Sequence, residues 1–135
     1  MRCDYPTPPS PIVDNDLLPK AVGEALCYYP RGEIGGSPSG KQPLILLHGV
    51  ARVAHTFDHL APHFSKNYHV IAVDMRGHGD SAWDPQGAYL VEDYVKDIEV
   101  LVERLQLCNI VLWGNSTGGR VAQVSPDGTR TWSRR

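Results

Sequence analysis

Short runs of apolar residues alternate with longer polar stretches along the middle of the chain. Three runs lie at residues 43–47, 69–73 and 110–113, and none alternates apolar with polar positions as a half-exposed strand does. Continuous runs of this length are typical of strands buried on both faces. Two longer segments, 54–66 and 90–106, space their apolar residues as a helix does. Strands that alternate with helices predict an α/β fold, with a mostly parallel sheet covered by helices on both faces.

The segment 90–106 has the clearest helical pattern. Its apolar residues fall on one face: Val91, Val95, Ile98, Leu101, Val102 and Leu105. A solvated face is expected for a second set: Glu92, Lys96, Glu99, Glu103 and Arg104. In the segment 54–66, Phe57, Leu60 and Phe64 also have helical spacing. Pro62 predicts a break in that helix, because proline has no backbone N–H to donate.

The two ends of the chain depart from this pattern. Residues 1–19 contain five prolines and predict a flexible arm, followed by a partial α/β domain over residues 20–124. Within that domain, residues 20–31 can supply one or two short strands, and the glycine- and serine-rich residues 32–42 predict a loop. Residues 125–135 break the pattern abruptly, so no regular element is expected in this aberrant tail.

Composition and charge narrow the class of protein. The chain has 135 residues, of which 41% are hydrophobic and 21% charged, as in an ordinary single globular domain. A net charge of -2 gives no reason to expect a nucleic-acid or membrane partner. Cys3, Cys27 and Cys108 form no C-x-x-C pair, which predicts free thiols in a cytoplasmic protein and no structural zinc.

The first candidate for chemistry directly follows the apolar run 110–113. Residues 114–118, Gly-Asn-Ser-Thr-Gly, fit the pattern G-x-S-x-G. After a buried strand, this pattern predicts a nucleophile elbow, in which the chain turns sharply from strand into helix with the serine at the apex. Ser116 is therefore expected in a strained backbone conformation. Gly114, Gly118 and Gly119 are expected to make crowded contacts that a Cβ would prevent.

Two further polar segments follow the other buried strands. His48-Gly49-Val50 comes after the run 43–47, and residues 74–81 come after the run 69–73. Parallel sheets carry their chemistry beyond the carboxyl ends of the strands, so the three segments are expected to meet at one edge. Together, "LLHG", "DMRGHGDS" and "GNSTGG" strongly resemble the motifs of the α/β-hydrolase family, in that family's order and spacing. The resemblance covers roughly residues 20–124.

The resemblance implies a role for each of these residues. Ser116 would attack a carbonyl carbon and form an acyl-enzyme, while the backbone N–H groups of Val50 and Thr117 would stabilise the oxyanion. His48 would orient the oxyanion loop beside Gly49. The remaining polar residues of the second motif, Asp74, Arg76 and His78, would fix their own loop through ion pairs and hydrogen bonds.

The resemblance also implies the substrate class. A serine nucleophile resembles the carboxylesterases, lactonases, cofactor-free haloperoxidases and carbon–carbon bond hydrolases of the family, rather than its epoxide hydrolases and haloalkane dehalogenases, which use aspartate. The expected partner is a small ester-like substrate, with no cofactor and no metal. His55, His59 and His63 are spaced four apart, but Pro62 interrupts them and no carboxylate or cysteine completes a metal site.

Two parts of the expected catalytic triad have no counterpart in the sequence. In this family the order is serine, then aspartate or glutamate, then histidine. All six histidines precede Ser116, and Asp127 is the only carboxylate after it. The prediction is therefore an α/β-hydrolase sheet truncated after the elbow, in an inactive chain whose tail arose from a one-nucleotide frameshift. A non-catalytic binding protein and a fragment without function remain as alternatives; the substrate, the cap and the oligomeric state stay open.

Overall fold

The computed structural model of the protein describes residues 26–28, 40–125 and 130–133. The predicted arm at residues 1–19 and most of the predicted loop at 32–42 lie outside the described residues. The domain boundaries at residues 19 and 124 therefore stay predictions.

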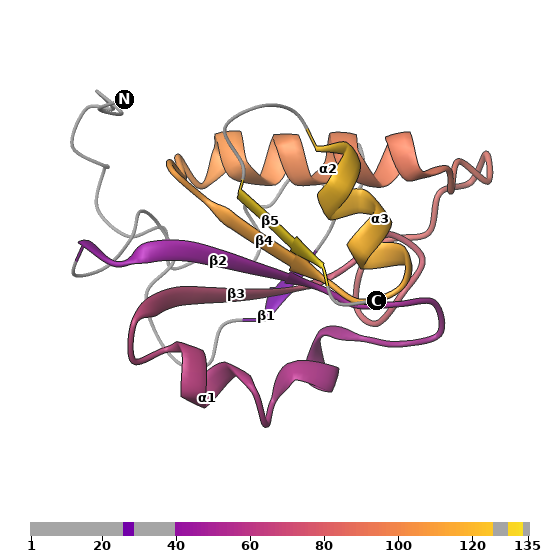
Figure 1. The fold of residues 1–135 in the computed structure, drawn as a ribbon. Coiled ribbons are helices and arrows are strands. Elements are labelled where there is room, and N and C mark those ends of the chain that lie inside the picture. The colour runs from indigo at the N-terminus through magenta and orange to yellow at the C-terminus, as the bar shows by residue number, and fades with distance from the viewer. Residues whose placement is uncertain (1–25, 29–39, 126–129, 134–135) are drawn as a thin grey trace.

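A five-stranded sheet forms the centre of the molecule (Figure 1). The strands are β1 (Leu26–Tyr28), β2 (Gln42–Leu47), β3 (Tyr68–Asp74), β4 (Val111–Gly114) and β5 (Arg130–Ser133). Their order is β1-β3-β2-β4-β5, in which β1 is antiparallel to β3 and every other neighbouring pair is parallel. The predicted mostly parallel α/β sheet is thus confirmed.

Helices cover both faces of this sheet (Figure 1). The short helix η3 (Ala54–Phe57) and helix α1 (Ala61–Phe64) lie on one face, while α2 (Val91–Arg104) and α3 (Thr117–Val124) lie on the other. Successive residues of a strand point to opposite faces. Ile45 and Leu47 accordingly join the core beneath α2 and α3, whereas Leu44 and Leu46 join the core beneath η3 and α1. The apolar runs are continuous because neither face of the strands meets water.

The segment around Pro62 is broken as predicted, because the short helix η3 ends at Phe57 and helix α1 begins only at Ala61. Pro62 lies after the break, in the first turn of α1, and not at the break itself. The physical reason is that the N–H groups of the first turn have no partner within a helix, so a proline there loses nothing. Leu60, at the junction, is 42% exposed rather than part of the apolar face.

Helix α2 follows the predicted pattern closely. It is shorter than the predicted segment 90–106, and Val95, Ile98 and Leu101 of the expected apolar face are buried. The five residues predicted to form the solvated face are all exposed: Glu92, Lys96, Glu99, Glu103 and Arg104.

Two predictions about the tail and the cysteines are wrong. Residues Arg130–Ser133 form β5, which pairs with β4 from Val111 to Gly114, so the outer edge of β4 is hydrogen-bonded. Cys108 is disulfide-bonded rather than a free thiol. A disulfide depends on which sulfur atoms lie close together in space, and the spacing of cysteines along the sequence does not show this. The lack of a C-x-x-C pair therefore did not exclude the bond.

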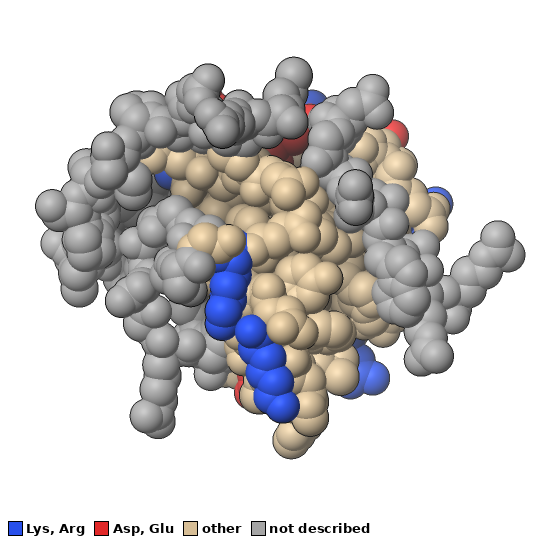
Figure 2. All heavy atoms as spheres, turned by 60° about the vertical axis from the view of Figure 1, so that its left-hand side comes forward, with Lys and Arg blue, Asp and Glu red and all other residues tan. Residues whose placement is uncertain are grey.

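Among the described residues, none of the helices has the length and apolar character that a membrane-spanning helix requires. On the face seen in Figure 2, the few Lys and Arg side chains lie among mostly uncharged residues.

Candidate active site

The three predicted motifs come together at one edge of the sheet. In the register of β2, Leu47 lies opposite Gly114 of β4 and Val73 of β3, so these three strands end almost level. His48-Gly49-Val50, the loop that begins at Met75, and Asn115-Ser116 therefore leave the sheet side by side. The expectation that the motifs share the carboxyl edge is confirmed.

Ser116 occupies the turn between β4 and α3. Its backbone angles are φ 54 and ψ -116, a combination that non-glycine residues rarely adopt. Helix α3 begins at the next residue, and the serine itself is exposed. This is the strained strand-to-helix turn that the sequence predicts, and such strain persists only where the surrounding structure holds it.

Glycines make this turn sterically possible. A Cβ on Gly118 would overlap the carbonyl oxygen of Leu47 and would lie 2.7 Å from that of His48. The close approach lets the Gly118 N–H donate to the His48 carbonyl at 3.1 Å. A Cβ on Gly114 would overlap the backbone of Gly118 and Gly119. The predicted crowding is confirmed at Gly114 and Gly118, and it presses the start of α3 against the end of β2. For Gly119 it stays a prediction.

The loop after β2 packs directly against Ser116. A Cβ on Gly49 would lie 3.1 Å from Ser116 Cβ and 3.7 Å from Ser116 Oγ. In the described part of the chain, the N–H groups of Val50 and Thr117 have no backbone acceptor. The first N–H groups of a helix have no intrahelical partner and favour negative charge. Thr117, the first residue of α3, supplies one such N–H group next to Ser116.

His48 is buried behind this loop and uses both ring nitrogens. Its Nε2 accepts a hydrogen bond from the Met75 N–H at 3.0 Å, and its Nδ1 lies 2.8 Å from the Gly49 carbonyl oxygen. Because the first partner can only donate and the second can only accept, the ring is the neutral tautomer that carries its proton on Nδ1. Burial lowers the pKa of His48, against an opposing effect of the bond to Gly49. His48 is therefore fixed in place and is not available as a base.

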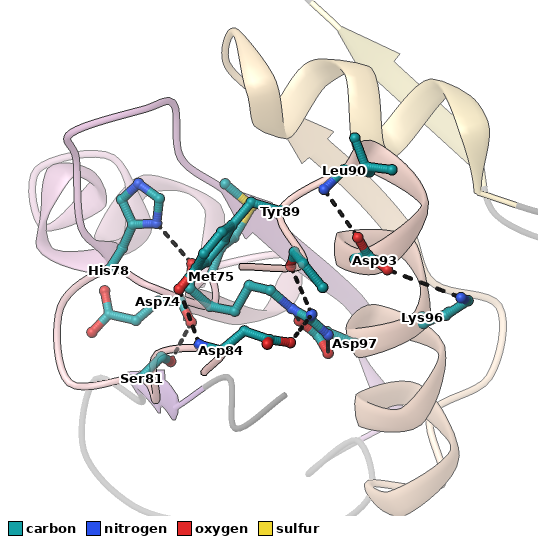
Figure 3. Close-up of polar contacts among 12 residues, drawn as sticks. Asp74, Met75, His78, Ser81, Asp84, Tyr89, Leu90, Asp93, Lys96 and Asp97 are labelled. Atoms are coloured by element: carbon teal, nitrogen blue, oxygen red, sulfur yellow. Dashed lines mark hydrogen bonds and ion pairs between the residues drawn. The ribbon is translucent and has the colours of Figure 1, made fainter. Parts of the chain in front are cut away.

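Arg76 connects the loop after β3 to helix α2 through hydrogen bonds to Asp84 and Asp97, both of which are labelled in Figure 3. Its Nε and Nη2 each donate to an oxygen of Asp97 at 2.6 Å, and its Nη1 donates to Asp84 at 3.1 Å and to the Ala88 carbonyl at 2.9 Å. The hydrogen bonds to Asp97 raise the pKa of Arg76, although burial opposes them. Sequence reasoning missed Asp97. The sequence did contain a sign of it: Asp97 lies three residues after Tyr94 and four before Leu101, which places a carboxylate on the buried face of the helix.

Asp74 and His78 hold the rest of that loop, as expected. The Asp74 carboxylate accepts from the Ala54 N–H at 2.6 Å and from the Asp80 N–H at 3.1 Å, and Ser81 Oγ donates to the Asp74 carbonyl. The His78 Nδ1–H donates to the Arg76 carbonyl at 3.0 Å, and its ring centroid lies 4.9 Å from that of His48. These contacts fit the structural role predicted for both residues.

The other histidines do not join the site in the described ranges. No hydrogen bond there links a histidine to Ser116, and no group of three His, Cys, Asp or Glu residues could hold a metal ion. His55 pairs with Asp58 at 3.0 Å, on the opposite face of the sheet from α3.

Comparison with known proteins shows which family the chain belongs to. The family model for the alpha/beta hydrolase fold matches residues 42–124. The chain belongs to the α/β hydrolase fold family. It is 36% identical over 107 residues to a serine hydrolase-like protein of Danio rerio, an alignment that covers 76% of this chain and 33% of the relative. It is 34% identical to the 3-hydroxybutyrate-oligomer hydrolase of Cupriavidus necator, over 74% of this chain and 36% of the relative.

Solved structures of the family share the fold. A thermophilic esterase from Thermogutta terrifontis aligns with a TM-score of 0.62 and 27% identity, covering 74% of this chain and 34% of the esterase. The chain thus spans about a third of the length of these relatives.

The close approach at Gly118 predicts the outcome of a single substitution. Gly118→Ala is expected to lower the free energy of unfolding by about 3 kcal/mol, the upper end for overpacking, because the atoms it meets belong to the backbone of β2. Urea denaturation measures this change. Gly87→Asn is the control, because Gly87 has φ 71 with open space around it and asparagine tolerates that conformation. Equal stability of the Gly118→Ala variant and the wild type would contradict the described packing.

The buried neutral His48 predicts how stability depends on pH. Its pKa in the folded state lies below the ordinary value of 6.5, so the unfolded chain takes up the proton first. The stabilisation is present above pH 6.5 and is lost as the pH falls toward the folded-state pKa. The half-buried His69, whose pKa is also lowered by its partial burial, adds to the same trend. The free energy of unfolding, measured with urea from pH 8 to pH 5, should therefore fall, and less steeply in His48→Asn than in the wild type. The exposed His59→Asn variant serves as the control; equal slopes in all three proteins would refute the role of His48.

Proposed function

We propose that the chain carries the nucleophile and oxyanion site of a serine hydrolase that acts on an ester, lactone or related carbonyl substrate. Ser116 is the nucleophile. The observation that carries this proposal is the backbone of Ser116, held at φ 54 and ψ -116 on a strand-to-helix turn directly against Gly49. A strained residue at an exposed apex is costly, and it is expected where function requires the side chain to be presented.

The proposed reaction is acyl transfer through a covalent intermediate. Ser116 Oγ bonds to the carbonyl carbon while its proton passes to a base, and the carbonyl electron pair moves onto oxygen. The N–H groups of Val50 and Thr117 donate to that oxyanion. When the carbonyl re-forms, the alkoxide leaves with a proton, and water later releases the acyl group from Ser116. One oxyanion donor of this kind is typically worth about 3 kcal/mol of barrier height.

The base of this reaction is not among the histidines of the chain that the structure describes. His48 already accepts from the Met75 N–H. In α/β hydrolases the base follows the serine, whereas every histidine of this chain precedes Ser116. We infer that the chain by itself forms an acyl-enzyme slowly and does not turn over. Hydrolysis at an enzymatic rate would need a base and a carboxylate from outside these residues.

The substrate class follows from the nucleophile and from the relatives. A serine attacks carbonyl carbons, and the relatives include an esterase and a hydrolase of 3-hydroxybutyrate oligomers. The alternative is a non-catalytic fragment or an α/β-hydrolase-like binding protein, in which Ser116 would be no more reactive than any exposed serine. A single labelling experiment separates these two functions.

The test supplies the missing base from solution. The chain is incubated with p-nitrophenyl acetate, with and without added imidazole, and the modified residues are located by mass spectrometry. One acetyl group on Ser116, formed faster with imidazole and stable once formed, is the expected result. Ser116→Ala should lose this adduct, whereas Ser125→Ala, at the far end of α3, should retain it. Acetylation that spreads over lysines and is unchanged in Ser116→Ala would favour the non-catalytic alternative.

A further inference from the structure

The Gly49–Val50 peptide group connects His48 to the proposed oxyanion site. A peptide unit is planar and trans, so the carbonyl of Gly49 and the N–H of Val50 point in opposite directions. The Gly49 carbonyl oxygen lies 2.8 Å from His48 Nδ1 and also accepts from the Arg52 N–H at 3.2 Å. These two bonds fix the direction of the carbonyl. They thereby fix the direction of the Val50 N–H, which lies in the same rigid plane.

The tautomer of His48 decides whether this bond can form. Only a ring protonated on Nδ1 can donate to the Gly49 carbonyl. The Met75 N–H, 3.0 Å from His48 Nε2, requires that nitrogen to be unprotonated. A shift of the proton to Nε2 would place two donors against each other and leave the Gly49 carbonyl facing a lone pair. The Met75 N–H therefore selects the tautomer that orients the Val50 N–H.

The backbone at Met75 is held in turn by its neighbour. Arg76 extends into helix α2, where it makes two parallel hydrogen bonds to Asp97 at 2.6 Å. The two side chains are only 7% and 4% exposed. On the other side of the same segment, the His78 Nδ1–H donates to the Arg76 carbonyl. Figure 3 shows this convergence, with Asp84 and Asp97 facing the same point between the loop and the helix.

We propose that Arg76 and Asp97 are positioning residues for the oxyanion donor. They hold the Met75 N–H against His48 Nε2, which keeps the proton of His48 on Nδ1 and so aims the Val50 N–H. This inference rests on the proposed role of Val50 as a donor. The rival explanation is that the ion pair only fastens the loop to α2. A buried ion pair is weak evidence for stability, because an apolar pair of similar volume often serves as well. The two explanations therefore predict different results when an apolar pair replaces Arg76 and Asp97. If the ion pair only fastens the loop, the His48 tautomer stays as in the wild type; if it positions the oxyanion donor, both tautomers appear.

The first test follows the His48 ring by nuclear magnetic resonance. Long-range nitrogen–proton spectra distinguish the two tautomers, and the wild type is expected to show Nδ1–H alone. In Asp97→Asn, and in the double variant Arg76→Met with Asp97→Leu, the ring is expected to populate both tautomers, with shifted Met75 and Val50 amide signals. The double variant removes both charges of the buried pair, and the partly exposed Asp84, which loses Arg76, still accepts from the Gln86 N–H. It therefore keeps the test valid if Asp97→Asn unfolds. A folded double variant that retains the pure Nδ1–H tautomer would overturn the proposal.

A matched control lies on the same helix. Asp93 accepts from the Leu90 N–H at 3.0 Å near the start of α2 and makes no hydrogen bond to Arg76 among the described residues. Asp93→Asn makes the same chemical change as Asp97→Asn. It should leave the His48 tautomer as in the wild type. Mixed tautomers in Asp93→Asn as well would show a general effect of α2 and would count against the proposal.

A second measurement connects the ring to the chemistry. The imidazole-dependent acetylation of Ser116 should slow roughly tenfold in the double variant, since complete loss of one oxyanion donor costs on the order of 100-fold or more. Mixed tautomers with an unchanged acetylation rate would refute the positioning role. If wild-type Ser116 is not acetylated at all, the proposed function fails, and the tautomer spectra alone then decide whether Arg76 and Asp97 control His48.

Discussion

The contact between the backbone of Gly118 and the carbonyls of Leu47 and His48 is the constraint on which the site depends. It presses the first turn of α3 against the end of β2, at a distance that only a residue without Cβ allows. Ser116 must then take up the sharp change of direction between β4 and α3, which accounts for its positive φ. The same contact brings Gly49 against the Ser116 side chain. The strain at Ser116 and its contact with Gly49 are thus both connected with one close approach.

The loops next to this contact are held by a neutral histidine and by charged side chains that have partners. Burial and the Met75 N–H both favour the neutral form of His48, so its ring places no positive charge behind the loop that carries Val50. Two charged groups of the second motif are paired away from Ser116: Arg76 with Asp97, and Asp74 with backbone N–H groups of its own and the preceding loop. Both arrangements satisfy buried polar atoms without making the loops apolar. These polar residues therefore hold the backbone of the loops that surround Ser116.

The strands and the elbow could be predicted from the sequence because each depends on local features. The runs that contain Ile45, Ile71 and Leu112 are continuous since both faces are covered, and the pattern G-x-S-x-G encodes a turn within five residues. The misses depend on tertiary context. The predicted break in the segment 54–66 is present, but Pro62 lies after it, in the first turn of α1. Asp97 pairs with a residue of another element, and the bond at Cys108 requires a second sulfur brought near in space. The sequence of strand β5 has no apolar run that would predict it, and the strand is recognised only by its pairing with the outer edge of β4.

The geometry of a covalent adduct tests the central claim most directly. A fluorophosphonate that reacts with Ser116 leaves a phosphonyl oxygen where the oxyanion of the reaction would lie. In a crystal structure of that adduct, the account predicts this oxygen within about 2.7–3.1 Å of the backbone nitrogens of both Val50 and Thr117. His48 should still lie against the Gly49 carbonyl. An adduct on Ser116 whose oxygen points into solvent, or a Gly49–Val50 peptide turned the other way, would contradict the account.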